Sequence, residues 1–292
     1  MMTRKSATFT ILLGGLFMSF VGLLMRLIED ASGFQILFYR SLTLSLVVII
    51  FACILTKSNP LAFLKRLDKF DFAMGAFLSL AFATYVFSML YTSVASTLFI
   101  LSVTPFLSAI IAWFWLGEKP RRIVWLTMIA ASFGVALMVN DGFADGKTFG
   151  NLLAFLSAVF FALVLVIARY SEKKNVLGGT FLGGGLACLI GFLSTIYFNQ
   201  GLLISHYDMS ISLLMGAFTI GLGITLVTIG TPFVPAAEVS LLVLVESVLG
   251  PVWVWIILFE AMTRLEIIGG IIIFVSLILL AKSNQDPFLE KK

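Results

Sequence analysis

Arg40 and Glu246 are charged residues inside stretches of sequence that are otherwise apolar. A charge is costly to bury in an apolar environment, so each is a candidate for a functional role. The Glu246 carboxyl could bind a substrate amine or exchange a proton, or it could join helices through backbone or hydroxyl donors. Arg40 could bind a substrate carboxylate through both prongs of its guanidinium. It could equally extend to the edge of the apolar layer or pair with Glu29, Asp30 or a helix C-terminus.

Four further residues are weaker candidates. Glu238 lies eight residues before Glu246, about two helical turns away on a similar face. It could form the inner mouth of a path to Glu246, although an acidic residue in the first turn of a helix also complements the helix dipole, and that interpretation is favoured. Tyr85, Trp113 and Trp253 combine aromatic surface with a polar edge, so each could line a cavity, while interfacial belts explain many such residues.

Metal, cofactor and nucleotide chemistry find no support in the sequence. His206 is the single histidine, and Cys53 and Cys188 lie in apolar runs, where a thiol behaves as a small hydrophobe. The sequence contains no nucleotide-binding loop of the form G-x-x-x-x-G-K-[ST], so no nucleotide site is expected. We expect no enzyme activity, no cofactor, no metal site and no nucleic-acid partner. The expected partners are a small-molecule substrate, the lipid bilayer and, if Glu246 titrates, protons as a coupling ion.

The composition of the chain is that of a membrane protein. Of its 292 residues, 60% are hydrophobic and 12% are charged, and the mean hydropathy is +1.10. Soluble domains carry roughly 25% charged residues, and disordered chains are rich in charge and poor in hydrophobes. Both classes are excluded, and a polytopic helical membrane protein remains.

The apolar runs are long enough for ten membrane-spanning helices of about 20 residues each. No connection between them is long enough to form a separate domain. The predicted fold is therefore an all-α integral membrane protein with ten transmembrane helices. The predicted spans are Thr8–Leu27, Phe34–Leu55, Asp71–Leu90, Ser93–Leu116, Ile123–Val139, Phe149–Arg169, Val176–Phe198, Ser210–Thr228, Ala236–Leu258 and Leu265–Ala281.

Basic residues indicate an orientation, because cytoplasmic loops are enriched in Lys and Arg. With a cytoplasmic N-terminus, fifteen of the 19 basic residues lie on the cytoplasmic side. The exceptions are Arg26, Arg40, Lys147 and Arg264. Ten spans then place both termini in the cytoplasm. The expected location is a bacterial-type cytoplasmic (inner) membrane.

The two halves of the chain resemble each other at a nearly constant offset in residue number. The matched positions are Met18 with Phe161, Arg26 with Arg169, Ala73–Phe77 with Leu214–Phe218, and Glu118 with Glu260. Because five spans is an odd number, the second half must enter the membrane from the opposite side. Such inverted repeats are typical of secondary transporters, with the substrate site between the halves. The predicted units are residues 8–140 and 149–282, followed by a cytoplasmic tail, 283–292.

Pro105 and Pro251 are the two prolines deep within predicted spans, and they fall in the fourth span of each half. Proline removes a backbone donor and can kink a helix. Paired interruptions point towards a binding site between the halves, so both residues are candidate hinges. Alternatively they only bend their helices, as prolines in membrane helices commonly do.

Five strings carry a resemblance to a known family. They are FYR at 38–40, LYTSVAST at 90–97, TPFLSAIIAWFWLGE at 104–118, GNLLAFLSAVFFALVLVIAR at 150–169 and PAAEVSLLVLVESVLGPVWVWIILFE at 235–260. In order and spacing they resemble the ten-helix EamA-domain family of the drug/metabolite transporter superfamily. The resemblance covers roughly residues 8–282. It implies secondary transport of small metabolites, often amino acids or related compounds, and commonly outward.

The predicted function is therefore export of amino acids or related compounds by alternating access through a central cavity. An uptake carrier of the same fold is the first alternative. A membrane receptor or scaffold that does not transport is less favoured. It predicts neither a cavity between the halves nor matched helix breaks.

Overall fold

The computed structural model describes residues 2–117, 119, 122–142, 148–171, 173, 176–234, 236–259 and 264–283. All regular secondary structure in these residues is helical, in agreement with the predicted all-α class. Seven helical segments are long and apolar enough to cross a membrane. Shorter apolar helices lie at Arg122–Gly134, Val245–Leu258 and Ile267–Ser276, within the other three predicted spans.

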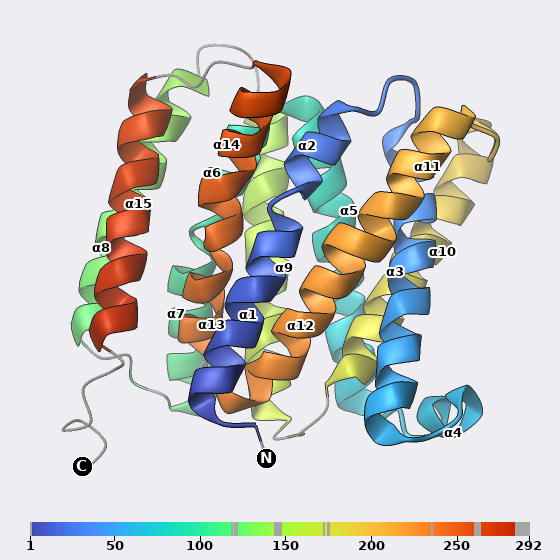
Figure 1. Ribbon diagram of the computed structural model, residues 1–292, viewed down its shortest axis with the longest axis horizontal. Coiled ribbons are helices and arrows are strands. Elements are labelled where there is room, and N and C mark those ends of the chain that lie inside the picture. Colours follow the sequence, from blue (N-terminus) through green and yellow to red (C-terminus); the bar gives the residue numbers. More distant parts are fainter. Residues whose placement is uncertain are drawn as a thin grey trace.

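The helices run side by side as one bundle, and the chain begins and α15 ends at the same end of it (Figure 1). The first half contains α1 (Arg4–Met18), α2 (Val21–Arg26), α3 (Gly33–Thr56), α4 (Pro60–Leu64), α5 (Lys69–Tyr91), α6 (Val94–Leu101), α7 (Thr104–Leu116) and α8 (Arg122–Gly142). The second contains α9 (Thr148–Tyr170), α10 (Leu177–Tyr197), α11 (His206–Leu214), the π-helix η1 (Met215–Leu222), α12 (Gly223–Gly230), the 3-10 turn η2 (Thr231–Phe233), α13 (Ala236–Val243), α14 (Val245–Leu258) and α15 (Arg264–Ser283).

Polar residues fix where the long helices begin. Ser32 and Gln35 form a capping box at the start of α3, each side chain binding the other's backbone N–H. Asp68 and Asp71 do the same at the start of α5. A capping box satisfies helix N–H groups that have no intrahelical partner. The apolar runs therefore start as helices at defined points close to the ends of the bundle.

Three of the predicted spans are each broken into two helices, the first of them at Ser19 and Phe20, between α1 and α2. The span 93–116 breaks at Ser102 and Val103, between α6 and α7. The span 236–258 breaks at Leu244, between α13 and α14. Ser102 and Leu244 are separated by the same offset as Glu118 and Glu260, so these two breaks fall at equivalent positions of the repeat.

The two prolines lie at different positions relative to these breaks. Pro105 lies in the first turn of α7, just after the break, where a missing N–H costs nothing. Pro251 lies inside α14, which continues through it to Leu258, and the interruption is at Leu244 instead. The break in the second half is therefore not located at its proline.

Close packing of glycines brings helices of the two halves together. α10 packs against α3 and α5, α9 packs against α5, and α12 packs against α1. A Cβ added at Gly75 would lie 2.6 Å from Cβ of Leu182, and one added at Gly216 would overlap the backbone oxygen of Arg40. Gly216 belongs to η1, and π-helical turns often occur at functional sites. Only glycine permits this approach of η1 to α3.

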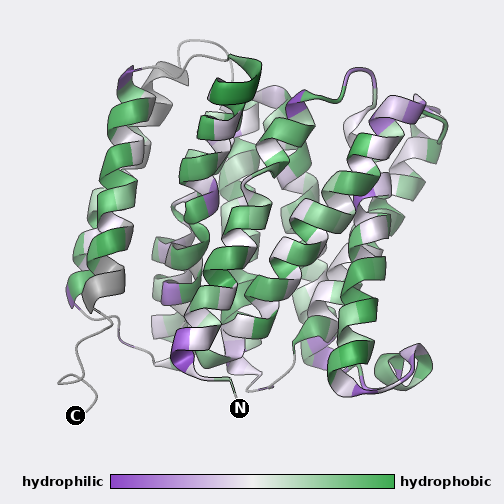
Figure 2. Cartoon of the chain, viewed as in Figure 1, coloured by the Kyte–Doolittle hydropathy of each residue, from purple (hydrophilic) through white to green (hydrophobic). Residues whose placement is uncertain are grey.

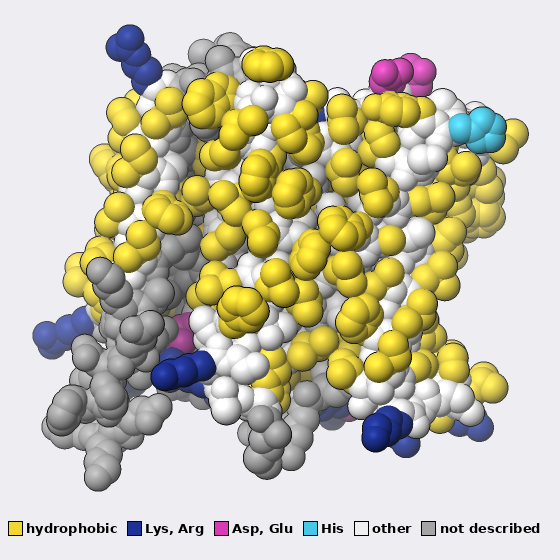
Figure 3. Space-filling model, in the orientation of Figure 1, with side chains coloured by type: hydrophobic (Ala, Val, Ile, Leu, Met, Phe, Trp, Pro, Cys, Tyr) yellow, Lys and Arg dark blue, Asp and Glu magenta, His cyan; other side chains and the backbone are white. Residues whose placement is uncertain are grey.

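The outer surface is apolar over the height of the bundle, and hydrophilic residues gather towards its ends (Figure 2). On the face drawn in Figure 3, hydrophobic side chains form a continuous belt and several Lys and Arg side chains lie along the lower rim. Exposed large hydrophobic side chains include Phe9, Phe114 and Phe259. Such a belt is suited to lipid contact.

Candidate functional site

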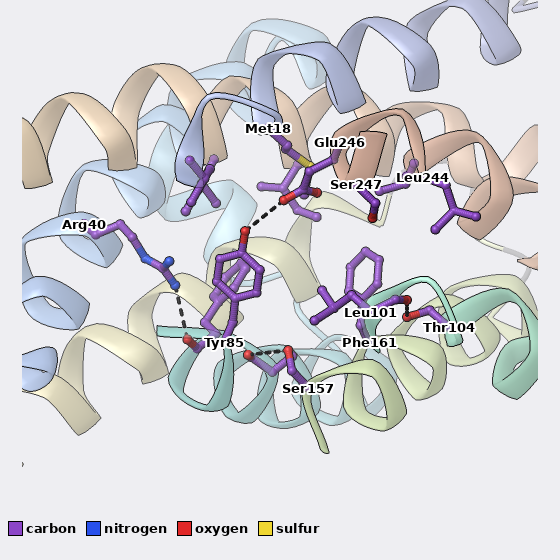
Figure 4. A pocket seen from close by; sticks show the side chains of 16 residues that line it. Met18, Arg40, Tyr85, Leu101, Thr104, Ser157, Phe161, Leu244, Glu246 and Ser247 are labelled. Carbon is purple, nitrogen blue, oxygen red and sulfur yellow. Dashed lines mark hydrogen bonds between the residues drawn. The ribbon is translucent and has the colours of Figure 1, made fainter. Parts of the chain in front are cut away.

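A cavity of about 60 Å³ lies among helices from both halves of the chain (Figure 4). Space of this size holds on the order of four to six water molecules. Most of its wall is apolar. The charged and hydroxyl-bearing residues of the wall are Arg40, Tyr85, Thr104, Ser157, Glu246 and Ser247. Three residues singled out in the sequence, Arg40, Tyr85 and Glu246, thus lie on one cavity.

Arg40 is fully buried, with 0% of its surface exposed. Its Nη2 donates a 3.3 Å hydrogen bond to the Phe82 carbonyl, and the guanidinium carbon lies 5.4 Å from the Phe82 ring centre. Nε and Nη1 have no hydrogen-bond partner. The side chain does not extend to the edge of the bundle, and among the described residues it forms no ion pair with Glu29 or Asp30. Arg40 therefore presents unused donors in a buried site.

Tyr85 and Glu246 meet across the two halves. The Tyr85 hydroxyl donates a 2.9 Å hydrogen bond to Oε1 of Glu246. Both side chains are buried, at 8% and 5% exposure, and the Arg40 guanidinium lies 5.9 Å from the centre of the Tyr85 ring. A cation, a phenol and a carboxyl group thus share one small volume, where electrostatic interactions are strong because the groups are buried away from bulk solvent.

The two matched helix breaks contact each other beside this group. The Ser247 hydroxyl, in the first turn of α14, donates a 2.9 Å hydrogen bond to the Leu98 carbonyl of α6. Thr104, in the first turn of α7, donates a 2.6 Å bond to the Leu101 carbonyl. These hydroxyls satisfy carbonyls near the end of α6. Both interrupted helices therefore contribute directly to the cavity wall.

The remaining candidates from the sequence lie away from the cavity wall. Glu238 is buried and forms a 2.8 Å ion pair with Arg4, at the end of the bundle where the chain begins. Trp113 is 43% exposed. Trp253 donates a 2.9 Å hydrogen bond from Nε1 to the hydroxyl of Ser19. None of these three residues lines the cavity that contains Arg40 and Glu246.

Glu118 and Glu260, which match in the repeat, lie outside the described residues, as does most of the predicted tail.

Several wall residues were not singled out from the sequence, although the repeat contains a signal for some of them. Phe161 of α9 and Met18 of α1 both line the cavity and occupy matched positions of the repeat. Thr104 and Glu246 both line it and are also related by the repeat offset. Applying that offset to the charged candidates would therefore have located Thr104. Ser157 and Ser247 have no comparable signal, because single serines in membrane helices are common.

A bundle of apolar helices around a small, partly charged cavity is compatible with a membrane transporter. The model of the EamA-like transporter family matches the chain twice, over residues 5–140 and 148–282. The chain belongs to this family, as the resemblance in its sequence indicated. It is accordingly a multi-pass membrane transporter of small metabolites.

Comparison with solved structures supports the fold. One protein of known crystal structure superimposes with a TM-score of 0.77 at 19% sequence identity, over 98% of this chain and 100% of its own. At this identity the likeness shows the shared fold alone. No curated protein matches the chain.

Proposed function

We propose that the protein exports amino acids or related compounds across a bacterial-type cytoplasmic membrane by alternating access. One observation carries the proposal: a buried guanidinium with unused donors and a buried carboxyl group lie on the same cavity. A molecule with both a carboxylate and an ammonium group would pair with both. Such a substrate would leave neither side chain as an isolated buried charge, which is the costly arrangement.

The proposed architecture is ten spans in two inverted units, residues 8–140 and 149–282, with both termini cytoplasmic. The matched breaks at Ser102 and Leu244 support it. The glycine contacts do so too: Gly75 and Gly216 occupy matched positions of the repeat, and so do their partners Arg40 and Leu182. The same close approach thus occurs twice, once with each half providing the glycine.

Aspartates near the starts of α5 and α11 give further support. Asp71 accepts a 2.7 Å hydrogen bond from Nζ of Lys173, in the connection between α9 and α10. Asp208 accepts 3.0 Å bonds from the backbone of Glu29, Asp30 and Ala31, in the connection between α2 and α3. Each half thereby holds the first connection of the other half. The two contacts lie at opposite ends of the bundle, as inverted repeats require (Figure 1).

Alternating access would use the interrupted helices α6/α7 and α13/α14 as moving parts. Their breaks meet at the cavity, so a change of angle at either break would change the wall. Pro105 and Pro251 remain hinge candidates, each on the C-terminal side of the break in its own half. Glu246 is the candidate for proton coupling, because a carboxyl group in an apolar layer is a natural carrier of a proton.

The test is counterflow into proteoliposomes. Purified protein is reconstituted with an excess of unlabelled amino acids inside, and uptake of trace radiolabelled alanine, serine, valine or leucine is followed. We expect transient accumulation above the empty-vesicle control. Absence of exchange with amino acids, nucleosides, vitamins and amines alike would favour the receptor or scaffold alternative. The direction of transport is measured in vesicles with an imposed pH gradient of either sign. An uptake carrier would be driven by the gradient opposite to the one that drives an exporter.

A further inference from the structure

The cavity wall opposite Arg40 differs in chemistry from the wall that carries the charged groups. In Figure 4, Arg40 and Tyr85 lie on one side, and Leu101, Thr104, Leu244 and Phe161 lie on the other. The first side comes from α3 and α5. The second comes from the two matched helix breaks and α9. A substrate held by its charged groups at the first side would place the rest of its body against the second.

Each hydroxyl group of the cavity wall already donates its hydrogen bond to another group of the protein. Thr104 donates to the Leu101 carbonyl, Ser157 to the Ala81 carbonyl, and Ser247 to the Leu98 carbonyl. Tyr85 donates to Glu246. A hydroxyl has a single hydrogen, so these four groups can only accept further hydrogen bonds. Among the described side chains of the wall, the free donors all belong to Arg40: Nε and Nη1 have no partner, and Nη2 uses one of its two hydrogens on the Phe82 carbonyl.

This distribution of donors determines which charged groups of a substrate the cavity can bind. One carboxylate can be satisfied, at Arg40, but a second carboxylate against the far wall would meet only oxygen lone pairs and hydrocarbon. A second ammonium there would find neutral oxygens and no second carboxylate, because Glu246 is the one carboxyl group among the described wall residues. Burying a charge without a partner of opposite sign is strongly unfavourable. The far wall therefore accepts an uncharged group and rejects a charged one.

We propose that the wall formed by Leu101, Leu244 and Phe161 is the side-chain subsite of the transporter, that it selects small uncharged side chains, and that Phe161 sets their maximum size. This rests on the proposed function and adds the orientation of the substrate: carboxylate at Arg40, ammonium at Glu246, side chain at the helix breaks. The small cavity is consistent with a small side chain. Phe161 is the largest side chain of this wall, so shortening it creates the most room.

The test compares three variants in the counterflow assay. Phe161→Leu replaces the aromatic ring by a smaller branched side chain, and Phe161→Met introduces the residue that occupies the matched position in the first half, Met18. Phe160→Leu is the control, because Phe160 is its half-buried neighbour on α9, stacks on Phe77 and does not line the cavity. Size-exclusion profile and thermal midpoint establish that each variant is folded, and the Met variant replaces the Leu variant if the latter is not.

The wild type is expected to exchange alanine, serine and valine, and to exclude aspartate and lysine. Phe161→Leu or Phe161→Met should raise the ratio of leucine to alanine exchange by about tenfold, the order of discrimination that a methylene-sized change in an apolar pocket provides. Phe160→Leu should leave the ratio unchanged. Exchange of aspartate or lysine as well as alanine, or an equal ratio in all folded variants, overturns this inference and leaves the proposed export function standing. No exchange of any amino acid by the wild type overturns the proposed function itself, and this inference with it.

Discussion

The Tyr85 hydroxyl donates a hydrogen bond of 2.9 Å to Oε1 of Glu246, and this bond joins α5 of the first half to α14 of the second. It crosses between two units that the sequence relates by a repeat, yet neither partner has an equivalent of the same kind. Thr104 stands at the position that matches Glu246, and apolar residues stand where Tyr85 and Arg40 would be repeated. The two halves of the chain thus differ at Arg40, Tyr85 and Glu246. These residues are the first targets for mutation.

Glu246→Gln should abolish the pH dependence of transport while leaving the protein folded. The amide keeps nearly the same shape but cannot release or take up a proton in this range. It also loses the charge that would pair with a substrate ammonium, so the residual counterflow should be slower at every pH. The measurement is counterflow of alanine from about pH 5 to pH 8, where the wild type is expected to vary and the variant to be flat. Glu238→Gln is the matched control, since Glu238 is a buried carboxyl in the same predicted span that pairs with Arg4 away from the cavity. An unchanged pH profile in Glu246→Gln would remove Glu246 as the proton carrier.

Arg40→Lys should weaken binding of carboxylated substrates by about 10- to 100-fold, because Lys keeps the charge but loses the paired donors of the guanidinium. The affinity is measured by competition against radiolabelled alanine. Alanine amide serves as the comparison ligand, since it has no carboxylate. A selective loss for alanine indicates a substrate ligand. An equal loss for both ligands would instead indicate that Arg40 only joins helices.

The class of fold and its charged candidates were predictable from the sequence because both depend on composition along the chain. A charge in an apolar run is visible without a structure, and Arg40, Tyr85 and Glu246 do lie together on the cavity. Whether Trp113 and Trp253 line the cavity was not predictable from the sequence. Sequence spacing shows that aromatic residues two apart occupy different faces of a helix, but the choice of inner face depends on the neighbouring helices.

The position of the helix break in the second half also depends on tertiary contacts. Proline suggested an interruption at Pro251, but the helix breaks at Leu244 and restarts at Val245. Nearby, the Ser247 hydroxyl reaches across to the Leu98 carbonyl in the other half of the chain. A contact between residues 149 positions apart leaves no local pattern in the sequence. Only the repeat, by matching Leu244 with Ser102, relates this break to one that a proline follows closely.

Gly216→Ala should destabilise the protein by about 1–3 kcal/mol, the usual cost of forcing an extra methyl group into a well-packed site. The added Cβ would overlap the Arg40 carbonyl oxygen, so η1 and α3 would have to separate. Gly185→Ala is the matched control, because a Cβ at Gly185 of α10 meets nothing within 4 Å. The readout is the thermal midpoint in detergent. Equal midpoints for the two variants would contradict the close approach of η1 to α3.

The ion pairs of Lys173 at the start of α5 predict a pH-dependent contribution to stability. Nζ of Lys173 lies 2.7 Å from Oδ1 of Asp68 and 2.7 Å from Oδ2 of Asp71. Partial burial opposes the charged form of Asp68, but hydrogen bonds from Lys173 and from backbone amides outweigh it and lower the pKa of Asp68. Partial burial likewise disfavours the charged form of Lys173, and its hydrogen bonds to Asp68 and Asp71 outweigh this and raise the pKa of Lys173.

A lowered carboxyl pKa stabilises the folded state above the ordinary aspartate pKa of about 4, and this contribution is lost as the pH falls through the folded value. The raised Lys173 pKa stabilises the folded state below the ordinary lysine value of about 10.4, and this part is lost at still higher pH. Lys173→Gln should therefore cost about 0.5–1 kcal/mol near neutral pH, a small value because these groups are partly exposed. The difference in thermal midpoint from the wild type should shrink below about pH 4 as Asp68 becomes protonated. Exposed Lys65→Gln is the control, and a Lys173→Gln penalty that is the same at neutral and at acidic pH would mean that the side chain contributes by packing and not by charge.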